Sequence, residues 1–373
     1  MYLLQALGSN GSGQLGLGHK DDTSTPEPVL LPASLTTTRQ KVNHIAAGGN
    51  HTLLLLSSGD LLWSGDPTTG ACGRVTATPS PTVPSFRPVD LSCLPADSKI
   101  QHVATTWEAS VVVIASSSSD RTEADDDAAA NKVYSFGSGG KGELGLGEGT
   151  VRAEQPTEIP DFPPAGTRVV HVAACMGHVV AVLSNGEAWG WGNGRKGQLG
   201  DPALGAVHSP RRIEGVEFKA VKVVCGREFT CLFGPPETGE VAVLGSDKWA
   251  VRSQAPEKVI GWKEVGAGWG SLFVLKEDGT LLSWGRNDHG QLAPENLGRV
   301  KHIAVGSEHA LALTEGGDLV VWGWGEHGNC GPIRDNNGKK GQQNRIASKE
   351  KGMEITMIGA GCATSWIASE GPA

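Results

Sequence analysis

A short glycine-containing pattern recurs seven times along the chain, and this repetition constrains the fold more than any other feature. Each copy has an apolar residue or a tryptophan close before a glycine, and the fullest copies continue to a Gly-Gln-Leu-Gly turn, as in residues 7–16 and 191–200. Many of the 53 glycines fall at these recurring offsets. Tight turns that need glycine explain such a pattern. The glycines that mark the seven copies are Gly8, Gly65, Gly137, Gly192, Gly245, Gly285 and Gly325.

A second pattern follows each copy of the first. It consists of apolar residues, a turn of small residues and a run rich in β-forming residues, and residues 42–53 match residues 300–311 position for position. Polar turns between apolar runs, such as residues 57–60, are typical of β-hairpins. The weaker copies begin at Ile100, Val169, Ala220, Trp262 and Ile355. The two patterns therefore give the same count of seven repeats.

Seven repeats of about four short strands predict an all-β, seven-bladed β-propeller. One such sheet is too small to bury both of its faces alone, and packing the sheets radially buries them against their neighbours. The first pattern opens the chain and the second closes it. We therefore expect the strand at residues 2–7 to join a blade completed by the C-terminal strands, which closes the ring.

The repeats span the whole chain, so residues 1–373 are expected to form a single propeller. The spacing between repeats varies, and the excess residues must form loops. Residues 115–131 are rich in Ser and Asp and predict a disordered insert. Residues 334–353, rich in Lys, Gln and Asn, predict a second, polar loop.

Charge and cysteine usage narrow the class of protein. The formal net charge of −8 argues against nucleic-acid binding as the main function. Seven scattered cysteines include no Cys-x-x-Cys pair, which favours a reducing compartment over a disulfide framework or a structural zinc site. The sequence shows neither a signal-peptide pattern nor a run of about 18 apolar residues. We expect a cytoplasmic protein, with the nucleus as a second location, and no membrane or direct nucleic-acid partner.

Histidine recurs at two fixed positions of the repeat. A catalytic role would not recur at one register in several blades, so we expect these rings to hydrogen-bond neighbouring blades. The histidines at the first position are His51, His178 and His309. Those at the second position are His44, His102, His171 and His302. Both sets are therefore interpreted as structural, the first set as bonding a neighbouring blade's turn.

Two tryptophans, Trp107 and Trp269, stand in turns of the second pattern where most other copies have smaller residues. Such a side chain is either exposed at one end of the ring or folded down to plug the central channel, and both alternatives stay open. Tryptophan is enriched in binding hot spots, and charged residues in the equivalent turns can steer a partner. The candidate partner-binding residues are Trp107, Trp269, Arg227, Glu228 and Glu108.

No arrangement typical of catalysis or metal binding can be placed on the chain. The Gly-Gln-Leu-Gly turns precede strands, whereas a phosphate-binding loop needs a following helix. We therefore expect no catalytic residue, no metal and no cofactor, and hence a protein that is not an enzyme.

Both patterns resemble those of the regulator-of-chromosome-condensation repeat family over essentially the whole chain. The resemblance implies a seven-bladed propeller. Residues 7–26, with Gly18-His19 before acidic residues and Thr25-Pro26, resemble the fungal alpha-tubulin-suppressor branch of that family. That branch implies a heterodimer with the small CSL-type zinc-finger electron carrier of diphthamide biosynthesis. The pair would support diphthamide formation on elongation factor two and Elongator-dependent modification of wobble uridines in transfer RNA.

Two other functions stay open. The founding member of the family is a guanine-nucleotide exchange factor for the Ran GTPase and binds nucleosomes, so exchange on a Ran-like small GTPase is the second hypothesis. The acidic balance and the lack of a basic N-terminal tail rank it below the first. A scaffold of ubiquitin ligation or signalling is the third hypothesis, because such repeats also occur appended to catalytic domains.

Overall fold

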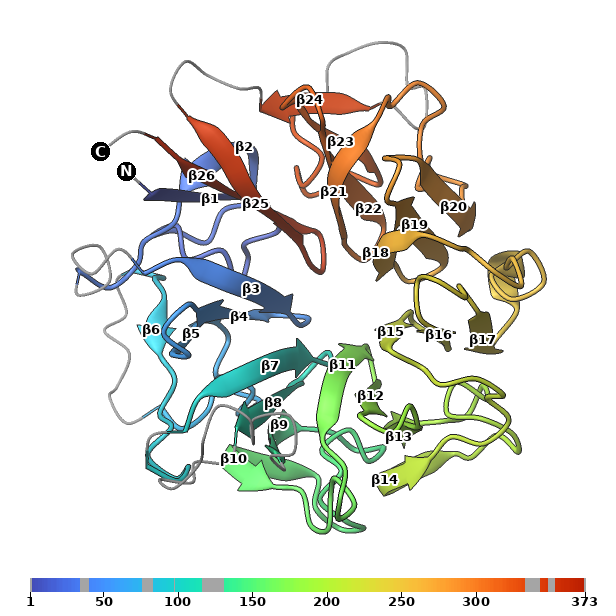
Figure 1. Ribbon diagram of the computed structural model, residues 1–373. Coiled ribbons are helices and arrows are strands. Elements are labelled where there is room, and N and C mark those ends of the chain that lie inside the picture. Colours follow the sequence, from blue (N-terminus) through green and yellow to red (C-terminus); the bar gives the residue numbers. More distant parts are fainter. Residues whose placement is uncertain are drawn as a thin grey trace, which may run out of the picture.

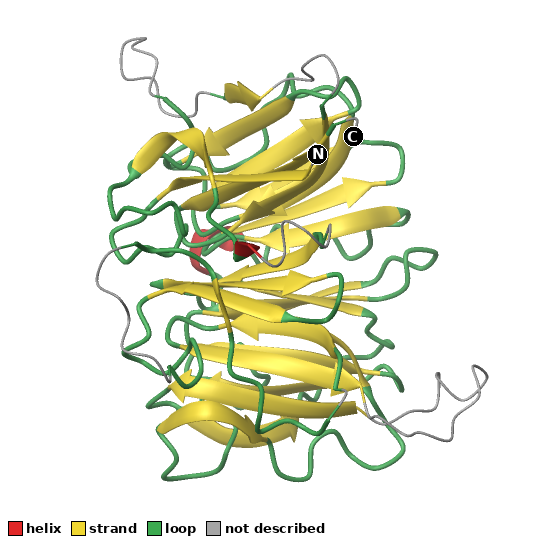
Figure 2. Cartoon of the chain, turned by 90° about the vertical axis from the view of Figure 1, so that its left-hand side faces the viewer, coloured by secondary structure: helices red, strands yellow, loops and turns green. Residues whose placement is uncertain are grey.

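The computed structural model describes residues 2–33, 40–75, 83–96, 98–115, 131–332, 343–347 and 353–371. Its strands form seven antiparallel sheets arranged as blades around a central channel (Figure 1). Seen edge-on, most loops gather at the two opposite faces of the ring (Figure 2). The predicted all-β, seven-bladed propeller is therefore confirmed.

The strands of each blade are given below in order from the channel outward (Figure 1). Blade 1 contains β3 (Val42–Ala47), β4 (His51–Leu56), β5 (Leu61–Gly65) and β6 (Arg87–Pro88). Blade 2 contains β7 (Ile100–Thr105), β8 (Ala109–Ala115), β9 (Asn131–Ser138) and β10 (Arg152–Glu158). Blade 3 contains β11 (Val169–Cys175), β12 (His178–Leu183), β13 (Ala188–Asn193) and β14 (Ala206–Arg212).

Two of the remaining blades have three described strands instead of four. Blade 4 contains β15 (Lys222–Cys225), β16 (Phe229–Phe233) and β17 (Val241–Gly245), followed by the 3-10 helix η2 (Lys248–Ala250). Blade 5 contains β18 (Trp262–Ala267), β19 (Ser271–Lys276) and β20 (Leu281–Gly285). Blade 6 contains β21 (Val300–Val305), β22 (His309–Thr314), β23 (Leu319–Gly323) and β24 (Asn344–Ala347). Blade 7 contains β25 (Glu354–Ala360), β26 (Thr364–Glu370), β1 (Tyr2–Gly8) and β2 (Thr23–Pro28).

Blade 7 closes the ring as the sequence predicts. Strand β1 pairs antiparallel with β26, from Tyr2 opposite Glu370 to Gly8 opposite Thr364. The two chain ends therefore share one sheet, and the inner strand of this blade contacts those of blades 6 and 1. Closure pairs the terminal strand of the chain, which would otherwise expose an unpaired edge.

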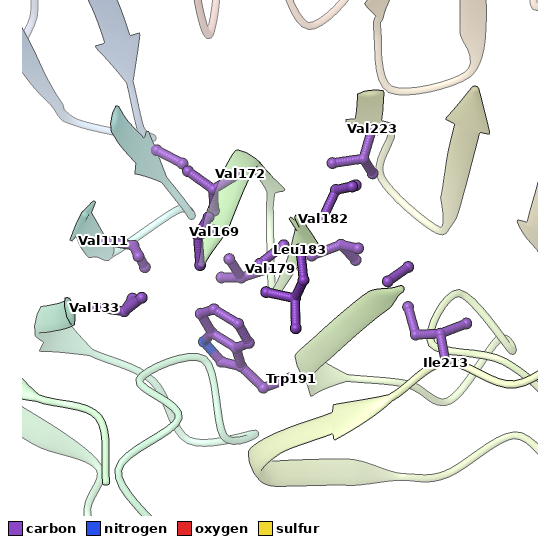
Figure 3. Close-up of a cluster of buried hydrophobic side chains, with 14 of the residues drawn as sticks. Val111, Val133, Val169, Val172, Val179, Val182, Leu183, Trp191, Ile213 and Val223 are labelled. Atoms are coloured by element: carbon purple, nitrogen blue, oxygen red, sulfur yellow. The ribbon is translucent and has the colours of Figure 1, made fainter. Parts of the chain in front are cut away.

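The hydrophobic core lies between the blades. Figure 3 shows one cluster in which side chains of blade 3 pack against Val111 and Val133 of blade 2 and Val223 of blade 4. The buried Trp191 sits in this cluster. A face of each sheet is thereby removed from water by its neighbour, which is the main stabilising term for such a fold.

Tryptophan recurs in the repeat because its ring nitrogen ties one blade to the next. Indole N–H groups donate to backbone carbonyls in loops of the preceding blade. These bonds run from Trp191 to Glu143 (3.0 Å), from Trp284 to Val251 (2.9 Å) and from Trp322 to Gln291 (2.9 Å). A buried indole thus fills the interface and also satisfies its only polar atom.

The seventh repeat glycine is Gly323, and the prediction of Gly325 was wrong by two residues. Gly323 has φ +107° and pairs with His309, just as Gly65, with φ +121°, pairs with His51. At Gly323 a Cβ would lie 2.5 Å from the carbonyl oxygen of Glu308. Residues 322–325 are two consecutive Trp-Gly pairs, so the sequence does not show which glycine holds the repeat position. The pairing of β23 with β22 shows that it is Gly323.

The two predicted inserts fall largely outside the described residues. Of residues 115–131, Ala115 ends β8 and Asn131 begins β9, and the residues between are not described. Within residues 334–353, the prediction of a loop was wrong for β24, because Asn344–Ala347 pair with β23 at the edge of blade 6. Ile346 packs against that blade's core, which explains why this segment is a strand.

Two absences can be stated for the described residues. No helix among them is long and apolar enough to span a membrane. All seven cysteines of the chain are free thiols.

Candidate functional site

One end of the channel is surrounded by the inner loops, which join the first and second strands of each blade. Backbone N–H groups of these loops donate to carbonyl oxygens of the next loop around the channel. Such bonds link Gly49 to Trp107, Trp107 to Met176, Arg227 to Trp269, Trp269 to Ser307 and Ser307 to Gly361, at 2.7–3.1 Å. We call this end of the ring the loop face. Because its loops are bonded to one another, side chains on them are held on a rigid platform.

Trp107 and Trp269 meet across the channel mouth on the loop face. They come from blades 2 and 5, and their ring centroids lie 6.1 Å apart at an interplanar angle of 45°. A Cβ on Gly49 would lie 2.5 Å from the Trp107 ring, so glycine at this position leaves room for the indole. Both rings line the channel and both remain half-buried. The two alternatives from the sequence are thus combined, since the rings narrow the channel and still present surface to solvent.

The charged residues predicted for this rim lie beside the tryptophan pair. The guanidinium of Arg227 lies 5.4 Å from the Trp269 ring centroid, within the range of a cation–π contact. Arg227 and Glu228 line two hollows on either side, with volumes of about 320 and 400 Å³. Glu108 lines the second hollow with Trp107. The structure therefore brings all five predicted residues to one face.

The same face carries three residues that were missed from the sequence, namely Trp249, Arg286 and Trp324. The Arg286 guanidinium lies 4.9 Å from the Trp249 ring and 5.9 Å from the Trp324 ring. These tryptophans are 41% and 37% exposed, and Trp324 stacks on His289 with centroids 4.4 Å apart. The sequence pattern predicted Trp324 at the repeat position, so its exposure on this face was not expected. The fully buried Trp322 occupies that position instead.

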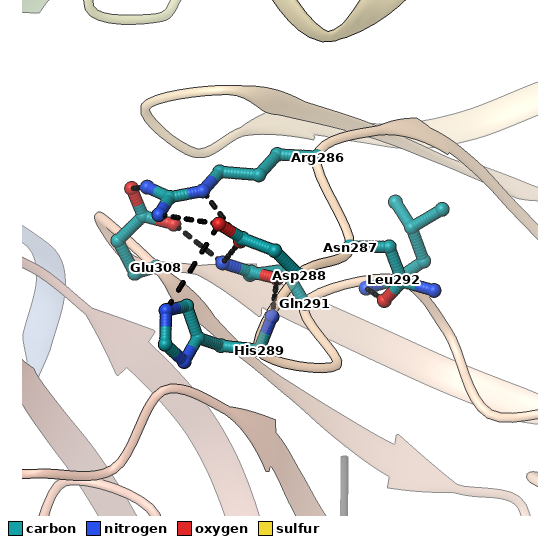
Figure 4. Close-up of polar contacts among 7 residues, drawn as sticks. All are labelled: Arg286, Asn287, Asp288, His289, Gln291, Leu292 and Glu308. Atoms are coloured by element: carbon teal, nitrogen blue, oxygen red, sulfur yellow. Dashed lines mark hydrogen bonds and ion pairs between the residues drawn. The ribbon is translucent and has the colours of Figure 1, made fainter. Parts of the chain in front are cut away.

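Arg286 is held in place by two carboxylates (Figure 4). It donates to both carboxylate oxygens of Asp288, at 2.6 and 2.9 Å, and forms an ion pair with Glu308. Gln291 donates to the other oxygen of Glu308 at 2.9 Å. The hydrogen bonds from Arg286 lower the pKa of Asp288 to about 2. A guanidinium held in this way loses little conformational entropy on binding, as expected of an arginine hot spot.

The first set of repeat histidines has the predicted structural role, with a different partner atom. Each Nε2 bonds a hydroxyl on the second strand of the next blade, not a turn: His51 to Ser110 (3.1 Å), His178 to Thr230 (3.0 Å) and His309 to Ser365 (2.9 Å). Each hydroxyl donates in turn to a backbone carbonyl of the histidine's own blade. Because the hydroxyl proton is used there, Nε2–H of the histidine must be the donor. Burial lowers the pKa of all three histidines to about 4, which keeps them neutral.

The second set of repeat histidines lies at the other end of the channel. His302 has the structural partner that was predicted, since its Nδ1 lies 2.6 Å from a carboxylate oxygen of Glu264. Within the described part of the chain no hydrogen bond engages the rings of His44, His102 or His171, so the predicted hydrogen bonds to neighbouring blades are not found for these three. Nor does any group of three or more His, Cys, Asp or Glu side chains there have the placement of a metal site.

Comparison with known proteins gives consistent matches. A family model described as the RCC1-like domain matches residues 4–367. An RCC1 repeat-containing protein of Schizosaccharomyces pombe is 31% identical over 305 residues, which cover 78% of this chain and 78% of that protein.

The chain is also similar to a mouse protein and to a solved yeast structure. The secretion-regulating guanine nucleotide exchange factor of Mus musculus is 28% identical over 313 residues, which cover 78% of this chain and 61% of that protein, less than two thirds of its length. The crystal structure of Prp20p from Saccharomyces cerevisiae, described with its binding properties to Gsp1p and histones, has a TM-score of 0.80 at 20% identity. That match covers 100% of this chain and 92% of the other, and it supports the fold.

Proposed function

The chain belongs to the RCC1-like domain family, and from this premise we propose that it is a non-catalytic protein that docks a protein partner on its loop face. The observation that carries this proposal is the contact between Trp107 and Trp269 with Arg227 over one ring. Half-buried aromatic rings on a rigid platform bury large apolar areas at low entropic cost, and aromatic and arginine side chains dominate protein interfaces. Arg286 between two exposed tryptophans extends the same surface.

For the partner, we favour the small CSL-type zinc-finger electron carrier of diphthamide biosynthesis. Residues 7–26 resemble the fungal alpha-tubulin suppressor, also called killer-toxin-insensitivity protein thirteen, which supports this choice. They run from the end of β1 into β2, and the loop between these strands starts beside an inner loop, since the Ser9 N–H donates to the Ala363 carbonyl at 2.8 Å. The resembling segment therefore begins at the loop face. The heterodimer would act in the cytoplasm, and also in the nucleus, in diphthamide formation and Elongator-dependent modification of transfer RNA.

The test is to isolate the partner and then to weaken the surface. Affinity purification from native extract should recover a small zinc-finger protein in stoichiometric amount. Affinity measured by calorimetry should then fall by about 2 kcal/mol, roughly 30-fold, for Trp269→Ala. Arg227→Ala should also weaken binding of the partner. Arg212→Ala is its matched control and should not, because Arg212 lies on the outer strand β14 and pairs with Glu187. Equal effects of the two arginine variants would rule out the loop face.

Exchange on a Ran-like small GTPase is the second candidate function. It is favoured by the names of two matched proteins, the mouse exchange factor and Prp20p with its binding to Gsp1p. A fluorescent-nucleotide release assay with a Ran-type GTPase distinguishes the two. Acceleration of release by this chain, with no small zinc-finger protein recovered from extract, would favour exchange over the first proposal.

A further inference from the structure

At the end of the channel opposite the loop face, one residue of each inner strand occupies a common register. In six of the seven inner strands a β-bulge immediately precedes this residue. Bulges re-aim side chains and often occur next to functional sites. The seven residues are His44, His102, His171, Lys222, Glu264, His302 and Met357. Four consecutive blades, 1 to 4, thus present a basic residue at this position.

The single carboxylate of this ring is already engaged. Glu264 bonds His302 with one oxygen at 2.6 Å and accepts the backbone N–H of Ile303 with the other at 2.8 Å. By contrast, within the described part of the chain the ammonium group of Lys222 makes no hydrogen bond or ion pair. The Nδ1 atom of His171 is buried there without a hydrogen-bond partner. Glu264 is therefore hydrogen-bonded through both oxygens, and its charge acts on Lys222 only through space, without an ion pair.

The basic residues of blades 1 to 4 face the channel. His44, His171 and Lys222 line the channel cavity, whose volume is about 330 Å³, and the ring of His102 lies 6.4 Å from that of His171. Burial first, and then the positive charge of Lys222, lower the pKa of His44, of His102 and of His171. Burial likewise lowers the pKa of Lys222. These groups repel one another when charged, and an anion placed between them would remove that repulsion.

We propose that this end of the channel binds an oxyanion, a phosphate or a carboxylate, between His44, His171 and Lys222. The unpaired ammonium supplies charge, and the imidazoles supply N–H donors that converge on one cavity. The Glu264 carboxylate, which bonds His302, is the acidic group of the ring that also acts on Lys222. This site lies at the end of the channel opposite the loop face and shares no residue with the surface proposed for docking.

The probe for this site is sulfate, which stays a dianion near neutral pH, added at constant ionic strength to the full-length protein. NMR of isotope-labelled histidine rings should show saturable shifts for His44, His102 and His171, and none for the buried His51. Binding should be tighter at about pH 5 than at about pH 7.5, because burial lowers the pKa of His44 to about 4 and the anion favours the protonated ring. Circular dichroism at both pH values verifies that the fold is intact.

Lys222→Met keeps the length of the side chain and removes the charge. It should weaken sulfate binding by about tenfold, whereas Lys301→Met, at an exposed lysine paired with Glu354, should leave it within about twofold. Absence of saturable shifts, or equal weakening by both variants, would overturn the proposal. A polyglutamate peptide that displaces sulfate would identify the acidic group of a protein segment as the source of the anion. Displacement by inorganic phosphate alone would identify a free ion.

Discussion

Trp107 and Trp269 contact each other across the channel mouth, with ring centroids 6.1 Å apart, although they belong to blades 2 and 5. Strand pairing does not bring the two residues together. Each lies on an inner loop whose backbone is hydrogen-bonded to the neighbouring inner loops. The contact therefore depends on the closed ring, which sets the distance between the two loops.

This contact should be measurable as a coupling energy. Trp107→Ala and Trp269→Ala together should destabilise the fold by less than the sum of the single variants, with a coupling of about 0.5–1.5 kcal/mol. Urea unfolding of the four members of the cycle measures it. Trp107→Ala combined with Trp249→Ala serves as the control and should be additive. A Trp107–Trp269 coupling near zero would mean that the rings do not interact in solution.

The histidine bonds between blades should contribute to the stability of the ring. His178→Ala removes the Nε2–H that bonds Thr230 and opens a cavity in a fully buried site, so we expect a loss of about 2–3 kcal/mol. Thr230→Val in the same background should cost about 1 kcal/mol more, because it also removes the bond that the Thr230 hydroxyl donates to the Gln198 carbonyl at 2.8 Å. His208→Ala, at a partly exposed histidine, should stay within about 0.5 kcal/mol. Similar losses for both histidine variants in urea unfolding would contradict the role assigned to His178.

Stability should fall as the solution is acidified. Burial lowers the pKa of His51, His178 and His309 to about 4, against about 6.5 in the unfolded chain. Between these values the unfolded chain binds more protons, so the free energy of unfolding rises with pH and their contribution is complete above about pH 6.5. Urea unfolding between pH 4.5 and 7.5 measures the slope. Replacing all three by glutamine should reduce this slope, and an unchanged slope would assign it to other groups.

The repeat register of blade 6 can be tested at one glycine. Gly323→Ala places a Cβ at φ +107° and 2.5 Å from a carbonyl oxygen, so the variant should lose at least about 2 kcal/mol. Gly140→Ala is the control, because a Cβ there meets no atom within 4 Å. Thermal unfolding compares the two. Equal melting temperatures would show that Gly323 does not occupy the strained position shared by the other blades.

The architecture could be predicted from the repeats, because each copy has to form the same turns and strands seven times. Turn glycines, hairpins and alternating patterns predict the blades, and the position of the first strand predicts closure by β1 and β26. The structural role of His51, His178 and His309 was also predictable, since one register recurred in three blades. Their partners were not, because the hydroxyls of Ser110, Thr230 and Ser365 belong to the next blade.

Which side chains contact one another depends on the packing of the blades. Trp322 and Trp324 are both followed by glycine, and strand pairing alone shows that the first is buried and the second exposed. Arg286 and Trp249 become neighbours because blades 4 and 5 pack side by side, which no local pattern records. The basic end of the channel arises in the same way, from bulges in separate strands. Local sequence fixes the form of each blade, whereas contacts across the ring depend on distances that exist only after it has closed.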